Sequence, residues 1–192
     1  MKNRSKFVLG CLFATCLATV AAAEFKPLKL DAVHSRVGFT ASTLLFDVGG
    51  RFGKYEITID GDQAKPTEAK LSVNIDAASI DTDNQKRDEH LTSPDFLDVK
   101  KYPKITFVSE SISESAAGLT VNGTLDLHGK KKKLSIPFKV ARGKNGAGVD
   151  TVAYKGKLTI DRKDFGIGAD SVAAKISLED QVNLDLLFVT LP

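Results

Sequence analysis

Residues 119–127 read Leu-Thr-Val-Asn-Gly-Thr-Leu-Asp-Leu. Apolar side chains stand at positions 119, 121, 125 and 127, and polar ones stand at 120, 122, 124 and 126. Successive side chains of a strand point to opposite faces of the sheet, so this alternation puts the apolar set on one face. A buried face opposite a solvated face is typical of antiparallel sheet. The stretch therefore predicts a β-strand that covers an apolar core.

The same alternation recurs on both sides of this stretch. Short glycine-containing segments such as 60–62, 128–130 and 143–146 separate the runs and favour hairpin turns. The total is about eight strands, which predicts an all-β fold. Eight strands with one apolar face can pack as a sandwich or close as a barrel, and the pattern leaves both open. The other predicted strands cover residues 36–41, 52–60, 70–76, 104–111, 133–140, 152–160 and 176–186.

One segment, residues 77–102, is long, charged and without the period of two. Asn84 to Leu91 predicts a short helix, and Ser93-Pro94-Asp95 resembles the cap and first turn of a second one. Long connections with local structure in a compact domain are often lids or rims of a binding site. We therefore expect a helical insertion between strands that lies near any site.

The first 23 residues predict a cleaved signal peptide. Lys2, Arg4 and Lys6 precede an apolar stretch from residue 7 to 20, and Ala21 to Ala23 provide small residues for cleavage. The alternative is a retained anchor, for which the apolar stretch is short. Cleavage leaves one domain, residues 24–192, with no cysteine, because both cysteines lie in the leader. Export to the periplasm and the absence of a stable membrane span follow as expectations.

Composition and motifs give no sign of catalysis. Without the three leader cations, 24 basic residues balance 24 acidic ones, so no general attraction to nucleic acid is expected. The three histidines, His34, His90 and His128, are far apart in the sequence, so no metal site is predicted. Asp31, His34 and Ser35 are interpreted as a turn rather than a catalytic triad. We expect neither a catalytic residue nor a cofactor.

The lysine run from Lys130 to Lys133 has two interpretations. It can be a solvated turn whose charges discourage edge pairing between sheets. It can also bind anionic lipid headgroups, at about 1 kcal/mol per residue near a charged membrane. The solvated turn is favoured, because short charge runs usually face water.

Several motifs that follow one another along the chain are characteristic as a set. The first group is Asp31 to Ser35 leading into Val37-Gly38-Phe39, followed by Gly50-Arg51-Phe52. The irregular segment carries the most distinctive motifs, and the set continues to the C-terminal third in the same order. These further stretches are residues 80–84, 87–91, 93–98, 102–103, 119–129 and 162–166. Together these motifs resemble the YceI-like family, and the resemblance covers nearly the whole chain after the leader.

The resemblance implies an eight-stranded antiparallel lipocalin-like barrel with a long interior pore. It also implies a periplasmic protein that binds a polyisoprenoid chain, such as a prenyl quinone or prenyl phosphate, without turnover. One departure is that many relatives carry a histidine in the first hairpin, where this chain has Ser42-Thr43-Leu44. The loop that follows is apolar, with Leu45 and Phe46. The headgroup preference of this protein is therefore expected to differ.

A generic apolar tube can bind such a chain, since each buried CH₂ contributes about 0.8 kcal/mol. Residues at the rim are expected to include Arg87, Asp88, His90 and Tyr102. The alternative for Arg87 and Asp88 is a structural ion pair that fixes the irregular segment as a lid. The predicted wall residues are Phe39, Phe52, Leu71, Val73, Phe107, Leu125, Leu127 and Phe165.

Two other functions remain open at this point. The protein could act on such a lipid as an enzyme or stress-protective protein, with His34, His90 or Asp164 near the reactive end. It could also be a filled barrel that serves as an interaction module. A homodimer and a quinone-dependent membrane enzyme are the partners left open beside the lipid.

Overall fold

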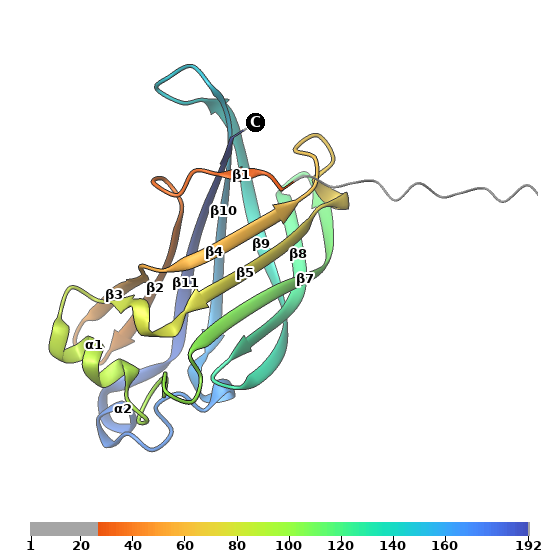
Figure 1. The fold of residues 1–192 in the computed structure, drawn as a ribbon. Coiled ribbons are helices and arrows are strands. Elements are labelled where there is room, and N and C mark those ends of the chain that lie inside the picture. The colour runs from red at the N-terminus through yellow and green to blue at the C-terminus, as the bar shows by residue number, and fades with distance from the viewer. Residues whose placement is uncertain (1–26, 192) are drawn as a thin grey trace, which may run out of the picture.

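A computed structural model describes residues 27–191, so the predicted signal peptide lies outside the described residues. The fold is all-β, as predicted, and Figure 1 shows long strands curling around one interior with two short helices at the lower end. The strands are β1 (Lys29–Leu30), β2 (Arg36–Thr43), β3 (Asp47–Phe52), β4 (Tyr55–Asp60), β5 (Lys70–Asp76), β6 (Ile80–Asp81), β7 (Lys104–Ser115), β8 (Gly118–Leu127), β9 (Lys130–Lys144), β10 (Asp150–Asp161) and β11 (Leu178–Leu191). The helices are α1 (Gln85–Thr92) and α2 (Val172–Ser177), with 3-10 turns at Pro66–Glu68, Ala77–Ser79 and Arg162–Phe165.

Eleven strands form one antiparallel sheet, but two pairs of them are halves of bent strands. β3 and β4 are separated only by Gly53 and Lys54, and β5 and β6 only by the Ala77–Ser79 turn. The two bent strands stay paired across the break, because the Gly53 N–H donates to the Ser79 carbonyl at 2.9 Å. Counted this way, and leaving aside the two-residue β1, eight strands follow one another, and β11 pairs back onto β2. This agrees with the predicted eight-stranded barrel.

Near the upper end, β4 diverges from β2, and the residues around β1 bridge the gap. The Leu28 N–H donates to the Ile59 carbonyl on β4 at 2.8 Å, while Lys29 pairs with Leu191 on β11. Below them, the Tyr55 hydroxyl donates to the Ser35 carbonyl at 2.7 Å. These bonds satisfy backbone groups that the divergence would leave unpaired.

The stretch 119–127 forms β8 as its alternation predicts. Its residues alternate strictly between buried and partly exposed, and Leu119, Val121, Leu125 and Leu127 belong to the core. The turn to β9 uses His128 at φ 54° and Gly129 at φ 72°, which is the pair of left-handed residues that a type I′ hairpin needs. A glycine at the second of these positions adopts that conformation without steric cost.

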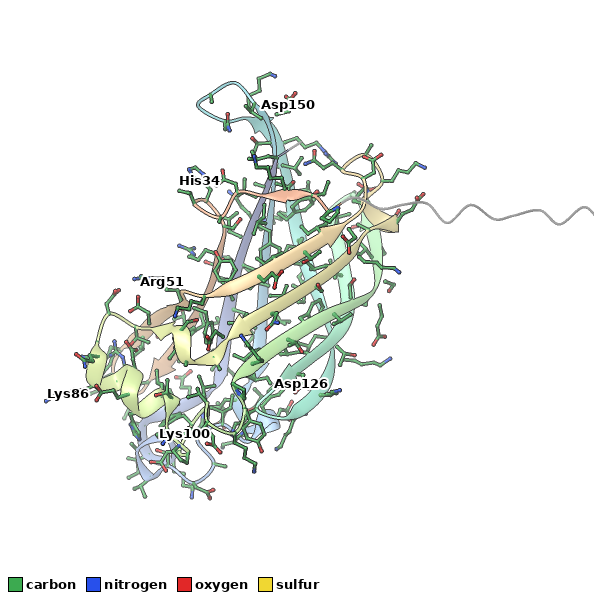
Figure 2. The ribbon with its side chains drawn as sticks, in the orientation of Figure 1. His34, Arg51, Lys86, Lys100, Asp126 and Asp150 are labelled. Carbon is green, nitrogen blue, oxygen red and sulfur yellow. The ribbon has the colours of Figure 1, made fainter. Side chains whose placement is uncertain are left out.

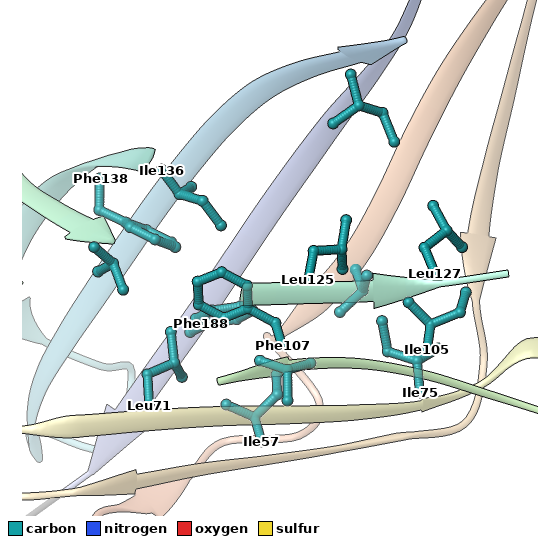
Figure 3. Packing of buried hydrophobic residues seen from close by; sticks show 14 of the residues in the cluster. Ile57, Leu71, Ile75, Ile105, Phe107, Leu125, Leu127, Ile136, Phe138 and Phe188 are labelled. Atoms are coloured by element: carbon teal, nitrogen blue, oxygen red, sulfur yellow. The ribbon is translucent and has the colours of Figure 1, made fainter. Parts of the chain in front are cut away.

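The upper part of the interior is filled by aromatic side chains. Phe138 and Phe188 are 3% and 2% exposed, and their ring centroids lie 5.6 Å apart. Figure 3 shows Phe138 beside Ile136 and Phe188 beside Phe107. Phe138 packs directly over Gly156 of the paired strand, where a Cβ would lie 2.5 Å from the ring. The missing side chain on β10 thus makes room for the aromatic plug.

Two local predictions were wrong and one was confirmed. The helix α1 begins after Asn84, whose side chain accepts the Arg87 N–H at 3.1 Å as an N-cap. Ser93 does not begin a second helix, because the chain turns back there and both Phe96 N–H and Asp98 N–H donate to its carbonyl. Ile176 belongs to α2 rather than to the last strand, since Ser171 caps that helix through Ala174 N–H.

Neither helix found within residues 27–191 has the length and apolar composition needed to cross a membrane.

Candidate functional site

A cavity of about 340 Å³ lies inside the barrel and opens at the end that carries α1 and α2. This volume falls at the lower end of the range of about 300–1,000 Å³ seen for ligand pockets. The wall is almost entirely apolar and comes from nearly every long strand. Residues from the later strands that line it are Leu134, Ile136, Leu158, Ile160, Val182, Leu184, Leu186 and Phe188.

Nine of the eleven predicted site residues line this one cavity. Seven of the side chains come from strands distant in sequence and two, Arg87 and His90, come from α1, and the barrel brings them together around a shared interior. They are Phe39, Phe52, Leu71, Val73, Arg87, His90, Phe107, Leu125 and Leu127.

Phe165 and Tyr102 do not line the cavity. Phe165 is 1% exposed and packs in the core below the cavity wall, with its carbonyl 3.0 Å from His128 Nδ1. Tyr102 stacks edge-on against His128, with centroids 4.5 Å apart, and leans over Gly129. The two aromatics instead tie the turn after β8 to the neighbouring loops. A sequence pattern predicts which side chains are buried, but it does not predict which of the buried side chains border the cavity.

The polar groups of the cavity lining all lie toward the helical end. Apart from glycine, they are Thr43 at the end of β2, Arg87 and His90 on α1, Arg162 after β10, and Ser177 on α2. The deeper wall, which includes Phe107 and Phe188, carries only apolar side chains. The cavity is therefore polar at its mouth and apolar in its depth.

Arg87 and Asp88 hold Thr82 rather than each other. Arg87 donates from Nε to Thr82 Oγ1 at 2.8 Å and from Nη2 to its carbonyl at 2.7 Å. Asp88 accepts from the hydroxyl and N–H of the same Thr82, which is 4% exposed. The predicted direct ion pair between Arg87 and Asp88 is therefore wrong. The two side chains nevertheless fix α1 to the end of β6, because both bind Thr82.

His90 is the titratable side chain of α1 that reaches the mouth. Its ring lies edge-on to Phe96, with centroids 4.9 Å apart, and its Nε2 is 3.4 Å from Asp95 Oδ2. The histidine side chain keeps 47% of its surface exposed. An exposed imidazole at the mouth can donate to or accept from a polar headgroup.

Arg162 was missed as a lining residue, although it stands in a motif that carries the family resemblance. It is 3% exposed and donates to the carbonyls of Ile167, Ala174, Leu178 and Glu179 as well as to Asp180. The bond from the Lys163 ammonium, with a smaller effect of Arg162, holds the pKa of Asp180 below its usual value. One guanidinium thus organises α2 and the start of β11 at the cavity mouth.

Lys130 to Lys133 form the start of β9, where Lys132 stands opposite the buried Leu125 and Lys133 faces the other side of the sheet. Lys132 contacts Asp164 at 2.9 Å and Lys133 contacts Glu110 at 3.0 Å. The Lys133 bond, with that of Thr124, lowers the pKa of Glu110. The lysines are exposed or partly exposed, as expected, but they open β9, so the interpretation as a turn is wrong; the turn itself is His128-Gly129.

His34 lies at the end opposite the cavity mouth, as Figure 2 shows. Asp31 accepts the N–H groups of Val33 and His34 and contacts His34 Nδ1 at 2.8 Å. Ser35 Oγ donates to the Asp31 carbonyl at 2.7 Å. The three side chains form a turn, as interpreted from the sequence, and the His34 contact lowers the pKa of Asp31.

The fold and the site define an all-β barrel protein with an apolar interior cavity open at one end. Residues 28–189 match the model of the YceI-like domain, so the chain belongs to the YceI-like family. A UPF0312 protein from Shewanella baltica is 33% identical over 187 residues, covering 95% of this chain and 96% of that protein.

Solved structures share the architecture. BcnA of Burkholderia cenocepacia superposes with a TM-score of 0.74 at 29% identity, covering 84% of this chain and 99% of that one. A polyisoprenoid binding domain from Saccharophagus degradans has a TM-score of 0.63 at 21% identity, covering 85% and 97%. The second likeness concerns the fold alone.

Proposed function

We propose that this protein is a periplasmic carrier that holds a polyisoprenoid lipid, such as a prenyl quinone or prenyl phosphate, in the barrel. The observation that carries the proposal is the polarity gradient of the cavity. The depth, lined by residues such as Leu71, Phe107 and Phe188, offers only hydrocarbon, while Arg87 and His90 stand at the mouth. An amphiphile with a long apolar tail and a small polar head matches this order.

The tail supplies most of the binding energy in this proposal. Each CH₂ that leaves water contributes about 0.8 kcal/mol, so a few prenyl units are sufficient without a directional contact. The headgroup would remain near the mouth, where Arg87, His90 and Tyr102 are the polar side chains predicted for it. Of these, Tyr102 is the weakest candidate, because it packs against His128 and does not line the cavity. Phe165 is likewise a structural residue in this proposal.

Several aspects of the proposal come from the sequence and from relatives. Residues 1–23, as a cleaved signal peptide, would direct the domain 24–192 to the periplasm, where membrane lipids with prenyl chains are accessible. The family membership supports the proposal, and the domain from Saccharophagus degradans carries a polyisoprenoid-binding name on the same fold. The function proposed is binding and delivery rather than chemical conversion.

The test is a matched pair of alanine-to-tryptophan variants. Ala41 lines the cavity, whereas Ala141 on β9 is exposed. Ala41→Trp should fill part of the hollow and weaken binding of a prenyl quinone by at least about tenfold, while Ala141→Trp should bind as the wild type does. Binding is measured by native mass spectrometry, and thermal unfolding confirms that both variants fold. Equal binding by all three proteins would contradict the proposal.

A further inference from the structure

An apolar patch surrounds one side of the cavity mouth. Its members are Leu44, Leu45 and Phe46 in the turn between β2 and β3, and Val172 and Ile176 on α2. Their exposed fractions are 82%, 84%, 61%, 69% and 77%. Single exposed apolar residues are ordinary, but five gathered at one opening indicate an interaction surface.

The patch is continuous with the cavity. The Leu44 N–H donates to the Ser177 carbonyl at 3.1 Å, which joins the turn to α2. The same helix presents Ala173 and Ser177 to the cavity lining and Val172 and Ile176 to the outside. An apolar chain leaving the cavity therefore passes directly onto the patch.

The backbone N–H groups of the turn between β2 and β3 are hydrogen-bonded within the protein. Thr43 N–H donates to the Phe46 carbonyl, and Leu44 N–H donates to Ser177. Leu45 N–H and Phe46 N–H both donate to Thr43 Oγ1, at 3.4 and 3.1 Å. All four N–H groups from Thr43 to Phe46 are satisfied within the protein. Such a turn can enter an apolar phase without stranding a donor, which an ordinary solvated turn cannot do.

We propose that this patch, called here the portal patch, docks the protein onto the surface of a lipid bilayer. The proposal rests on the carrier function, since docking would let a prenyl chain move between cavity and membrane without crossing water. The patch is small for a second copy of the chain, because stable protein interfaces use about 20–30 residues on each side. The segments that carry the patch contain charges of both signs, Lys175 on α2, Asp170 before it and Asp47 at the start of β3. Docking should therefore depend on apolar insertion and only weakly on salt.

The experiment uses the natural absence of tryptophan from the chain. Leu45→Trp places one indole in the portal patch, and Val33→Trp places one at the opposite end, at a residue that is 87% exposed. The processed protein, isolated from the periplasm of an expressing bacterium, is mixed with phosphatidylcholine vesicles. The fluorescence emission of Leu45→Trp should shift to the blue on mixing, and brominated phosphatidylcholine in the vesicles should quench it. The emission of Val33→Trp should neither shift nor be quenched.

A second variant measures the strength of docking. Leu45→Asp should weaken co-sedimentation with the same vesicles by at least about tenfold, because a fully buried leucine corresponds to a factor of that order. The matched control is Val33→Asp, which should sediment as the wild type does. Both substitutions alter exposed side chains, so folding should be retained.

Several outcomes would overturn the proposal. They are an unshifted Leu45→Trp emission, unchanged sedimentation of Leu45→Asp, or a dimer in solution that Leu45→Asp dissociates. The indole reports insertion whether or not the cavity holds lipid. Failure of the carrier proposal in the Ala41→Trp test and failure of docking are therefore separate results.

Discussion

The two ends of the barrel use the same kind of residue for opposite purposes. At the upper end, Phe138 and Phe188 meet at 5.6 Å and fill most of the interior, leaving a hollow of about 40 Å³, and Phe188 also forms the inner end of the cavity wall. At the lower end, Phe39 and Phe52 also lie close, with centroids at 5.8 Å, yet they border an open cavity and are only partly buried. Apolar side chains thus form a largely filled core in one half and the wall of a larger cavity in the other.

The difference teaches where stability and function reside. A filled half loses stability when a side chain is removed, because the cavity left behind cannot collapse fully. A lined half already contains a hollow, so removal mainly changes its volume. We therefore expect truncations of similar size to have unequal effects at the two ends.

The largest effect is expected for Phe138→Ala in the filled half. The ring is 3% exposed, and its loss should lower the free energy of unfolding by about 3–5 kcal/mol. Chemical denaturation followed by circular dichroism measures this change. A loss below about 1 kcal/mol would show that the upper end is not a close-packed core.

Arg162→Met is expected to follow, because it removes the donors that serve four carbonyls and Asp180 at the lower end. Each buried acceptor left unpaired costs about 1–3 kcal/mol, and partial hydration should keep the total near 2–3 kcal/mol. The control is Arg36→Met, because Arg36 is exposed and pairs with Asp185 at 3.3 Å. That control should change stability by no more than about 1 kcal/mol. Equal losses in the two variants would contradict a structural role for Arg162.

Phe52→Ala in the lined half should cost less than Phe138→Ala, about 1–2 kcal/mol, because one side of the ring borders the cavity. The variant should also admit a bulkier prenyl ligand. Urea unfolding and a competition between prenyl quinones of different tail length measure the two effects. A stability loss equal to that of Phe138→Ala would remove the distinction between the two ends.

The smallest effect concerns pH. Lys163 and Arg162 lower the pKa of Asp180 in the folded protein below its ordinary value of 3.8. The stability that ionised Asp180 contributes is therefore fully present above the ordinary pKa of 3.8. It is lost as the pH falls through the lowered pKa of the folded state. Asp180→Asn should be less stable than the wild type near neutral pH, and the gap should close in acid. The unfolding midpoints of both proteins, measured from neutral pH into acid, test this prediction. A difference in stability that does not change with pH would contradict the assigned role of Asp180.

The fold could be predicted well because strand patterning is local. Alternation over residues 119–127 determines which face is buried whatever the partners are. The helix α2 was missed because Ile176 also fits the alternation of the strand that follows, while the Ser171 cap and the buried Arg162 bonds favour the helix. A local pattern cannot show that tertiary contact.

The site could be predicted in part for a related reason. Inward-facing residues such as Leu71, Leu125 and Phe107 necessarily face a shared interior once the sheet closes. Whether that interior is filled or hollow depends on side-chain volumes across the barrel, which is why Phe165 was placed on the wall and Leu184 was not. The exposed Leu45 carried a signal in the sequence, since three apolar residues occupy a tight turn.

The most direct measurement is native mass spectrometry of the processed protein from a bacterial periplasm, followed by organic extraction of the bound material. The account predicts a stoichiometric prenyl lipid whose mass equals the difference between the loaded and the unfolded protein. A clean mass of the protein alone, with no uptake of added prenyl quinone, would contradict it.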